Sequence, residues 1–164
     1  MILGLSTSTY TLIHVLISLA GIISGFAVVF GMLSGKRLDG TNAVFLVTTI
    51  ATSVTGFGFP IHKIGPPHIL GVLSLIVLAI ALVARYRNHL AGRARKVYAI
   101  SAIIALYFNV FVLVVQAFQK VGALHALAPT QKEPPFAIAQ GAVLLLFVIL
   151  GIMSTKRFQA LEIA

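Results

Sequence analysis

The stretch PHILGVLSLIVLAIALVARY, residues 67–86, decides the fold, because it runs for about twenty residues with no charged side chain before Arg85. An α-helix rises about 1.5 Å per residue, so ~20 apolar residues cross a hydrocarbon core roughly 30 Å thick. Four other runs have the same character: Tyr10–Ser34, Asn42–Pro60, Val97–Gln119 and Pro135–Thr155. The connecting segments are short, which favours antiparallel neighbours. The sequence therefore predicts one all-α domain over residues 1–164, an integral membrane bundle of five transmembrane helices in up-down order.

The composition supports this class. The chain is 59% hydrophobic and only 9% charged, whereas about a quarter of the residues of a soluble domain are charged. It contains no cysteine, which excludes disulfides, thiolate catalysis, iron–sulfur clusters and thiolate metal sites.

The net charge of +9 is distributed unevenly along the chain. If the five runs alternate in direction, one side carries Lys36, Arg37, Arg85, Arg87, Arg93, Arg95, Lys96, Lys156 and Arg157. The other side carries only Lys63, Lys120 and Lys132. Short cytoplasmic loops are enriched in Lys and Arg, so we expect the N-terminus outside and the C-terminus in the cytoplasm. The basic stretch Arg85–Lys96 then faces anionic lipid headgroups, and nucleic acid is not an expected partner.

Several classes of activity lack the residues they need. The only carboxylates are Asp39, Glu133 and Glu162, and all three lie outside the apolar runs. Ion-driven transporters normally keep an ionisable acid at membrane depth. Ser18 and His14 lack a third group to orient them as a hydrolase would require. We expect neither transport nor stand-alone enzyme activity.

Histidines and amides are the informative polar residues. His14, Asn109, Gln116 and Gln140 lie within apolar runs, and the expected orientation brings them to the outer half of the bundle. The outer loops or helix starts add His62, His68 and His125.

Three interpretations of this polar cluster stay open. The side chains could hydrogen-bond between helices, at about 0.6 kcal/mol per contact. Alternatively, His14 and His68 could ligate one haem b as two neutral imidazoles, with Asn109, Gln116 and Gln140 as partners that orient the rings. The third interpretation is a zinc or copper(II) site, with ligands His14, His62, His68 and His125.

Small residues predict where the helices touch. Gly21 and Gly25 form a small-xxx-small pair on the same stripe as Ser18 and His14. Because lipid provides no hydrophobic drive for helix association, such pairs supply packing through close backbone approach.

A run that opens with His68 is followed by NHLAGRARKVY, residues 88–98, in which a His-x-x-Gly-Arg loop leads into Tyr98. About a third of the chain thus resembles a group of small, uncharacterised bacterial multi-pass membrane proteins, which are similar to cytochrome b561-type haem bundles. The resemblance implies a redox bundle of the bacterial inner membrane with His68, and also His89, as ligands. Two-haem members carry histidine pairs 13–14 residues apart on one helix, and this chain has none. His68 and His89 are about 31 Å apart along a helix, so they cannot share one haem.

The sequence thus predicts a small membrane redox component that binds one haem b, or a quinone, near its outer face. The alternative is a non-catalytic accessory subunit or assembly factor, whose lipid-facing surfaces would contact membrane-protein partners.

Overall fold

A computed structural model describes residue 2 and residues 4–59 and 65–160. Within them the chain forms α1 (Thr7–Leu33), α2 (Asp39–Gly56), α3 (Pro66–Leu82), α4 (Arg93–Lys120), α5 (Gly122–Leu127) and α6 (Pro134–Ala160). A π-helical turn, η1 (Val83–Arg87), extends α3. The described residues contain no strand, only an isolated bridge between Ile2 and Leu5. The predicted all-α class is confirmed.

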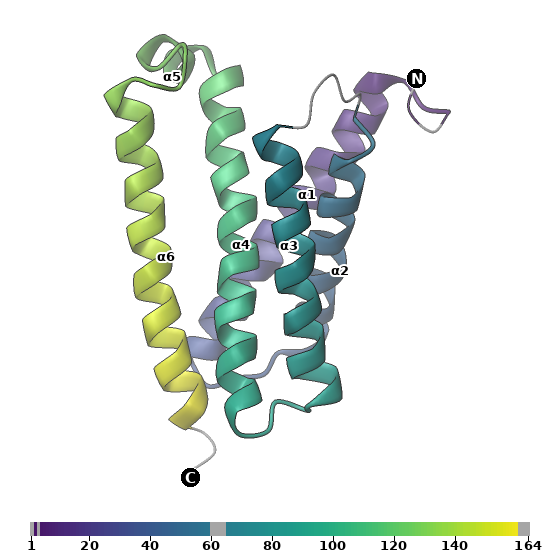
Figure 1. The fold of residues 1–164 in the computed structure, drawn as a ribbon, viewed down its shortest axis with the longest axis vertical. Coiled ribbons are helices and arrows are strands. Elements are labelled where there is room, and N and C mark those ends of the chain that lie inside the picture. Colours follow the sequence, from purple (N-terminus) through teal and green to yellow (C-terminus); the bar gives the residue numbers. More distant parts are fainter. Residues whose placement is uncertain (1, 3, 60–64, 161–164) are drawn as a thin grey trace.

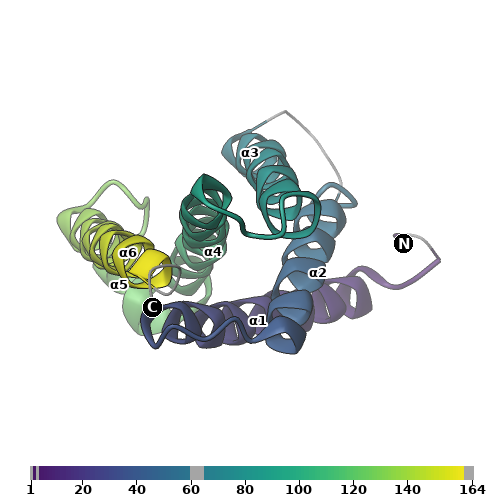
Figure 2. The same cartoon turned by 90° about the horizontal axis from the view of Figure 1, so that it is seen from below.

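The helices surround a central α4, which packs against α1, α3 and α6 (Figure 1). Seen from below, α6, α4, α3 and α2 follow an arc, and α1 runs obliquely along its open side (Figure 2). The connections at residues 34–38 and 88–92 lie at the lower end of the bundle, whereas α5 and the start of α1 lie at the upper end (Figure 1).

Four helical segments of the described chain are long and apolar enough to cross a membrane: Thr7–Leu33, Pro66–Arg87, Arg93–Lys120 and Pro134–Phe158. These correspond to four of the five predicted runs. The remaining run forms α2, which is 18 residues long and carries six Ser and Thr hydroxyls. Because of these polar side chains, α2 is not among the segments that are apolar enough to cross a membrane by composition alone.

Close backbone approach joins α1 to its neighbours, as the small-residue stripe predicted. A Cβ added to Gly25 would lie 2.6 Å from Leu106 Cδ1 and 2.9 Å from Phe45 Cε2. One turn higher, a Cβ on Gly21 would lie 3.2 Å from the hydroxyl oxygens of both Thr48 and Thr49. Helix α1 therefore packs directly on α2 and α4.

Charged residues at the lower end differ from the expectation. From the sequence, Arg85 was expected at the edge of a span and Asp39 outside the apolar runs, and no contact between them was predicted. Instead the side chain of Arg85 is 4% exposed and forms a salt bridge with Asp39 at the start of α2. The Arg85 guanidinium also lies 5.3 Å from the ring centre of Tyr98, whose hydroxyl donates to the Asn42 side chain. This network ties η1 and α4 to α2.

Helices α4 and α6 extend beyond the apolar runs that predicted them. Arg93, Arg95 and Lys96 belong to the first turn of α4, not to a loop. The Arg95 side chain is hydrogen-bonded within the fold: it donates to the carbonyls of Leu90 and Phe158, each at 3.3 Å. Helix α6 extends through Lys156 and Arg157 to Ala160.

The Arg85–Asp39 pair should stabilise the fold. We expect Asp39→Asn to lower the free energy of unfolding by about 2 kcal/mol, because it leaves the buried guanidinium without its counter-charge. The loss should be smaller than for a fully buried pair, since the Asp39 side chain is 74% exposed. Thermal or denaturant unfolding in detergent measures it. In an Arg85→Met background the same substitution should have almost no effect, and an equal loss in both backgrounds would exclude the coupling.

Candidate functional site

The candidate site lies at the upper junction of α1 and α2, formed by Tyr10, His14, Thr55 and Phe59. The Tyr10 hydroxyl donates to the Thr55 carbonyl at 2.7 Å, and His14 Nδ1 lies 2.7 Å from Thr55 Oγ1. The rings of Tyr10 and His14 both meet Phe59 edge-on, with centroids 5.1 and 5.2 Å apart. Tyr10 was missed from the sequence, although it lies one turn before His14 on the same helix face.

The hydrogen bonds fix which nitrogen of His14 carries the proton. A hydroxyl has one proton, and that of Thr55 points to the carbonyl of Ala51 at 2.7 Å, with Thr52 as a longer alternative at 3.2 Å. With that proton on the Ala51 carbonyl, the Thr55 oxygen accepts from His14, which assigns the Nδ1–H form to neutral His14. Its Nε2 carries a lone pair and has no hydrogen-bond partner among the described residues.

His68 is held in the opposite state. Its Nδ1 accepts the backbone N–H of Gly65 at 3.3 Å, in the first turn of α3, so neutral His68 is protonated on Nε2. Its ring lies 6.2 Å from that of Phe57. His68 thus serves as a local cap for the start of α3.

The proton positions on His14 and His68 determine whether both side chains could bind one haem iron as predicted. An imidazole that binds iron through Nε2 normally keeps Nδ1–H in a hydrogen bond, which is the state of His14. His68 would have to move its proton and give up the Gly65 bond. The pair His14 and His68 therefore does not fit a bis-imidazole haem as these hydrogen bonds hold it.

The predicted metal set does not assemble in the part of the chain that the structure describes. No group of three His, Asp or Glu side chains there could hold an ion. His125 is exposed on α5, with Nδ1 3.3 Å from the carbonyl of Phe118. His62 lies outside the described residues. His89, the further ligand implied by the resemblance, is exposed in the lower connection.

The three amides do not bond to either histidine. Gln140 Nε2 donates to the Phe111 carbonyl at 3.2 Å and joins α6 to α4. Asn109 Nδ2 is buried without a partner beside Gly21, and Gln116 is half-buried on α4. The expected orienting partners of the histidines are replaced by Thr55 and Gly65.

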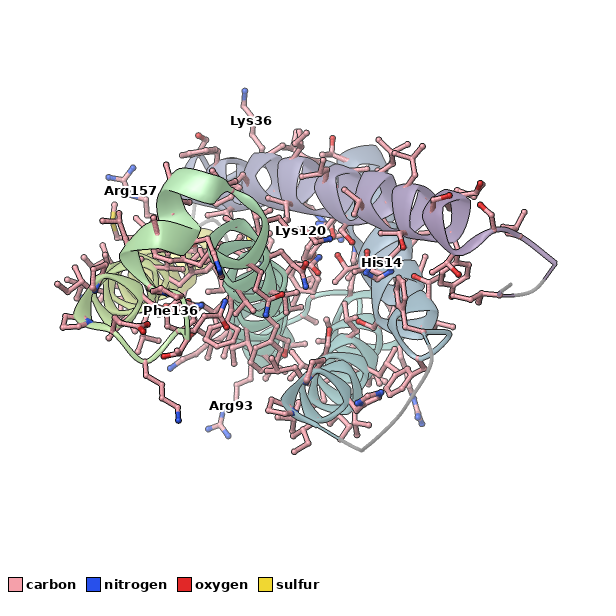
Figure 3. All side chains as sticks on the ribbon, turned by 90° about the horizontal axis from the view of Figure 1, so that it is seen from above. His14, Lys36, Arg93, Lys120, Phe136 and Arg157 are labelled. Atoms are coloured by element: carbon pink, nitrogen blue, oxygen red, sulfur yellow. The ribbon has the colours of Figure 1, made fainter. Side chains whose placement is uncertain are left out.

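One cation approaches the site. Lys120, at the end of α4, extends toward α1 and His14 when the bundle is seen from above (Figure 3). It is close enough to act electrostatically on the imidazole. The site thus combines a hydrogen-bond acceptor at His14 Nε2, a cation and apolar walls.

Comparison of the chain with protein-family models, with curated proteins and with solved structures finds no match. The resemblance to cytochrome b561-type bundles therefore stays a prediction from the sequence.

The proton positions can be measured directly. We expect long-range ¹H–¹⁵N spectra of histidine-labelled protein at neutral pH to show the Nδ1–H form for His14 and the Nε2–H form for His68. Thr55→Val removes the acceptor of His14, so it should release the tautomer preference and cost about 0.6 kcal/mol of stability, the average for such contacts. The His68 signals should not change. An Nε2–H form of His14 in the unmodified protein would contradict the assignment.

Proposed function

We propose that this chain is a small membrane redox component that binds the head group of a quinol through His14 at the outer end of the bundle. The carrying observation is the 2.7 Å contact of His14 Nδ1 with Thr55 Oγ1, which favours a lone pair on His14 Nε2, and this nitrogen has no hydrogen-bond partner among the described residues. In the proposal a quinol hydroxyl donates to this nitrogen.

The surroundings suit such a ligand. A molecule that reaches the site from the bilayer needs an apolar body and a polar head, and a quinol has both. Aromatic rings of Tyr10 and Phe59 flank His14, and Lys120 adds a cation that favours the electron-rich oxygens of the head group. The oxidised quinone offers only acceptors, so His14 Nε2 favours the reduced form.

Crossing of the membrane by α2 belongs to the same proposal. Four of its hydroxyls donate back to carbonyls one turn earlier: Thr48 to Val44, Thr52 to Thr48, Ser53 to Thr49 and Thr55 to Ala51. Such bonds remove most of the cost of placing hydroxyls in hydrocarbon. With α1 and α3 covering it, α2 can serve as the fifth span of an up-down bundle.

The charges support an orientation with the lower end in the cytoplasm and the upper end, with the N-terminus, outside. The lower connections and the flanking helix ends carry nine of the twelve Lys and Arg residues. This bias is the usual mark of the cytoplasmic side of a bacterial inner membrane.

Single-cysteine labelling tests the five-span topology, since the chain has no cysteine of its own. We expect a membrane-impermeant maleimide to label Thr130→Cys in intact cells, and to label Ser34→Cys and Asn88→Cys only after lysis. If α2 does not cross, positions 34 and 88 must lie on opposite sides. Labelling of only one of positions 34 and 88 in intact cells would thus contradict five spans.

Quinol binding is tested by titrating the detergent-purified protein with a short-chain quinol under reducing conditions and with the matching quinone. A hydrogen bond contributes about 1 kcal/mol, so we expect about fivefold tighter binding of the quinol. His14→Leu should remove this preference, and His68→Ala and His125→Gln should retain it. A His14→Leu protein that keeps the fivefold preference for the quinol would overturn the proposal and favour the accessory-subunit alternative, with partner co-purification as the next measurement.

Haem b is a second candidate, because the Nδ1–H bond of His14 is the one expected of an axial ligand. An absorption spectrum of protein expressed with haem precursor separates the two ligands. A Soret band lost in His14→Leu would favour haem, and a featureless visible spectrum together with a His14-dependent quinol preference would favour the quinol.

A further inference from the structure

A groove of about 450 Å³ lies between α3 and α4 near the lower end of the bundle. Its walls are apolar, and two polar residues, Asn88 and Arg93, line it at the connection between the helices; the apolar lining is Ala79, Ile80, Val83, Ala84, Ala94 and Val97. The lining begins at Ala79 in α3 and ends at Asn88, just beyond η1. The groove therefore has apolar walls and one polar end.

Arg93 supplies the positive charge at that end of the groove. Arg93 forms no hydrogen bond or ion pair with the described residues, and it projects outward from the bundle (Figure 3). Two neighbouring arginines do have partners within the fold: Arg85 pairs with Asp39, and Arg95 donates to backbone carbonyls. Among the described residues, no carboxylate lines the groove. A ligand there meets an available guanidinium beside an amide.

We infer that this groove binds an anionic phospholipid, with its phosphate at Arg93 and Asn88 and one acyl chain along the apolar walls. The charge at the polar end complements an anionic head group and disfavours a head group that carries its own cation. The apolar part matches the first segment of an acyl chain that enters from the lower leaflet. This inference does not depend on the proposed quinol site, which lies at the opposite end of the bundle.

Native mass spectrometry of the detergent-purified protein tests the site with phosphatidylglycerol and phosphatidylcholine of identical acyl chains. A cation near an anionic lipid contributes about 1 kcal/mol, so the first phosphatidylglycerol should bind about fivefold tighter than the first phosphatidylcholine. Arg93→Gln should abolish this preference. The matched control Arg87→Gln removes the same charge from an exposed neighbour that does not line the groove, and it should retain the preference.

A second pair of variants tests the acyl chain. Ala79 is exposed in the groove, so Ala79→Leu fills it without disturbing the core and should weaken binding of both lipids severalfold. Ala142→Leu, at an exposed position on α6, should have no effect. Glycerol phosphate, which has no acyl chain, should not compete. Equal effects of Arg93→Gln and Arg87→Gln would show surface charge alone, and unchanged binding by Ala79→Leu would exclude the groove; either result overturns the inference.

Discussion

The close approach of α1 to α2 and α4 at Gly25 and Gly21 is the constraint on which the rest of the bundle depends. Lipid gives two helices no hydrophobic reason to associate, so their attraction comes from dispersion across a short interhelical distance. A side chain at Gly25 would collide with Leu106 and Phe45. The same face of α1 continues upward through Ser18 to His14, so the contact that packs the helix also brings His14 to Thr55. Packing and the candidate site are consequences of one stripe.

A hydrogen bond within α2 both suits this helix to the membrane and sets which nitrogen of His14 carries the proton. In hydrocarbon a hydroxyl needs an internal acceptor, and the Thr55 proton takes the Ala51 carbonyl. That bond leaves only the lone pairs of Thr55 Oγ1 for His14, which must then donate from Nδ1. Hence the lone pair on His14 Nε2 follows from a threonine donating to its own helix. The chemical character of the site is set by a bond that contributes little to packing.

The apolar runs sufficed to predict the helices, because length and the absence of charge are properties of the sequence alone. The glycine stripe also predicted the α1 interface, since small residues at helical spacing have few other uses in a membrane. The Arg85–Asp39 pair could not be predicted, because its partners are separated by 46 residues and only the fold brings them together. The hydrogen bond of His68 could not be predicted for a different reason. The partner of His68 is the backbone N–H of Gly65, and no pattern of residues predicts a bond to a backbone group.

The buried groups without partners limit how far the His14 site extends. Asn109 Nδ2 and Thr49 Oγ1 lie beside Gly21, where α1, α2 and α4 meet, and neither has a hydrogen-bond partner within the described residues. Seven residues separate Gly21 from His14, about 10 Å along α1, so a hydroxyl held at His14 Nε2 is more than hydrogen-bond distance from both. An orphaned buried donor costs about 1–3 kcal/mol, which a water molecule at this junction would offset. The unpartnered Asn109 and Thr49 groups therefore lie at a level of the bundle separate from that of His14.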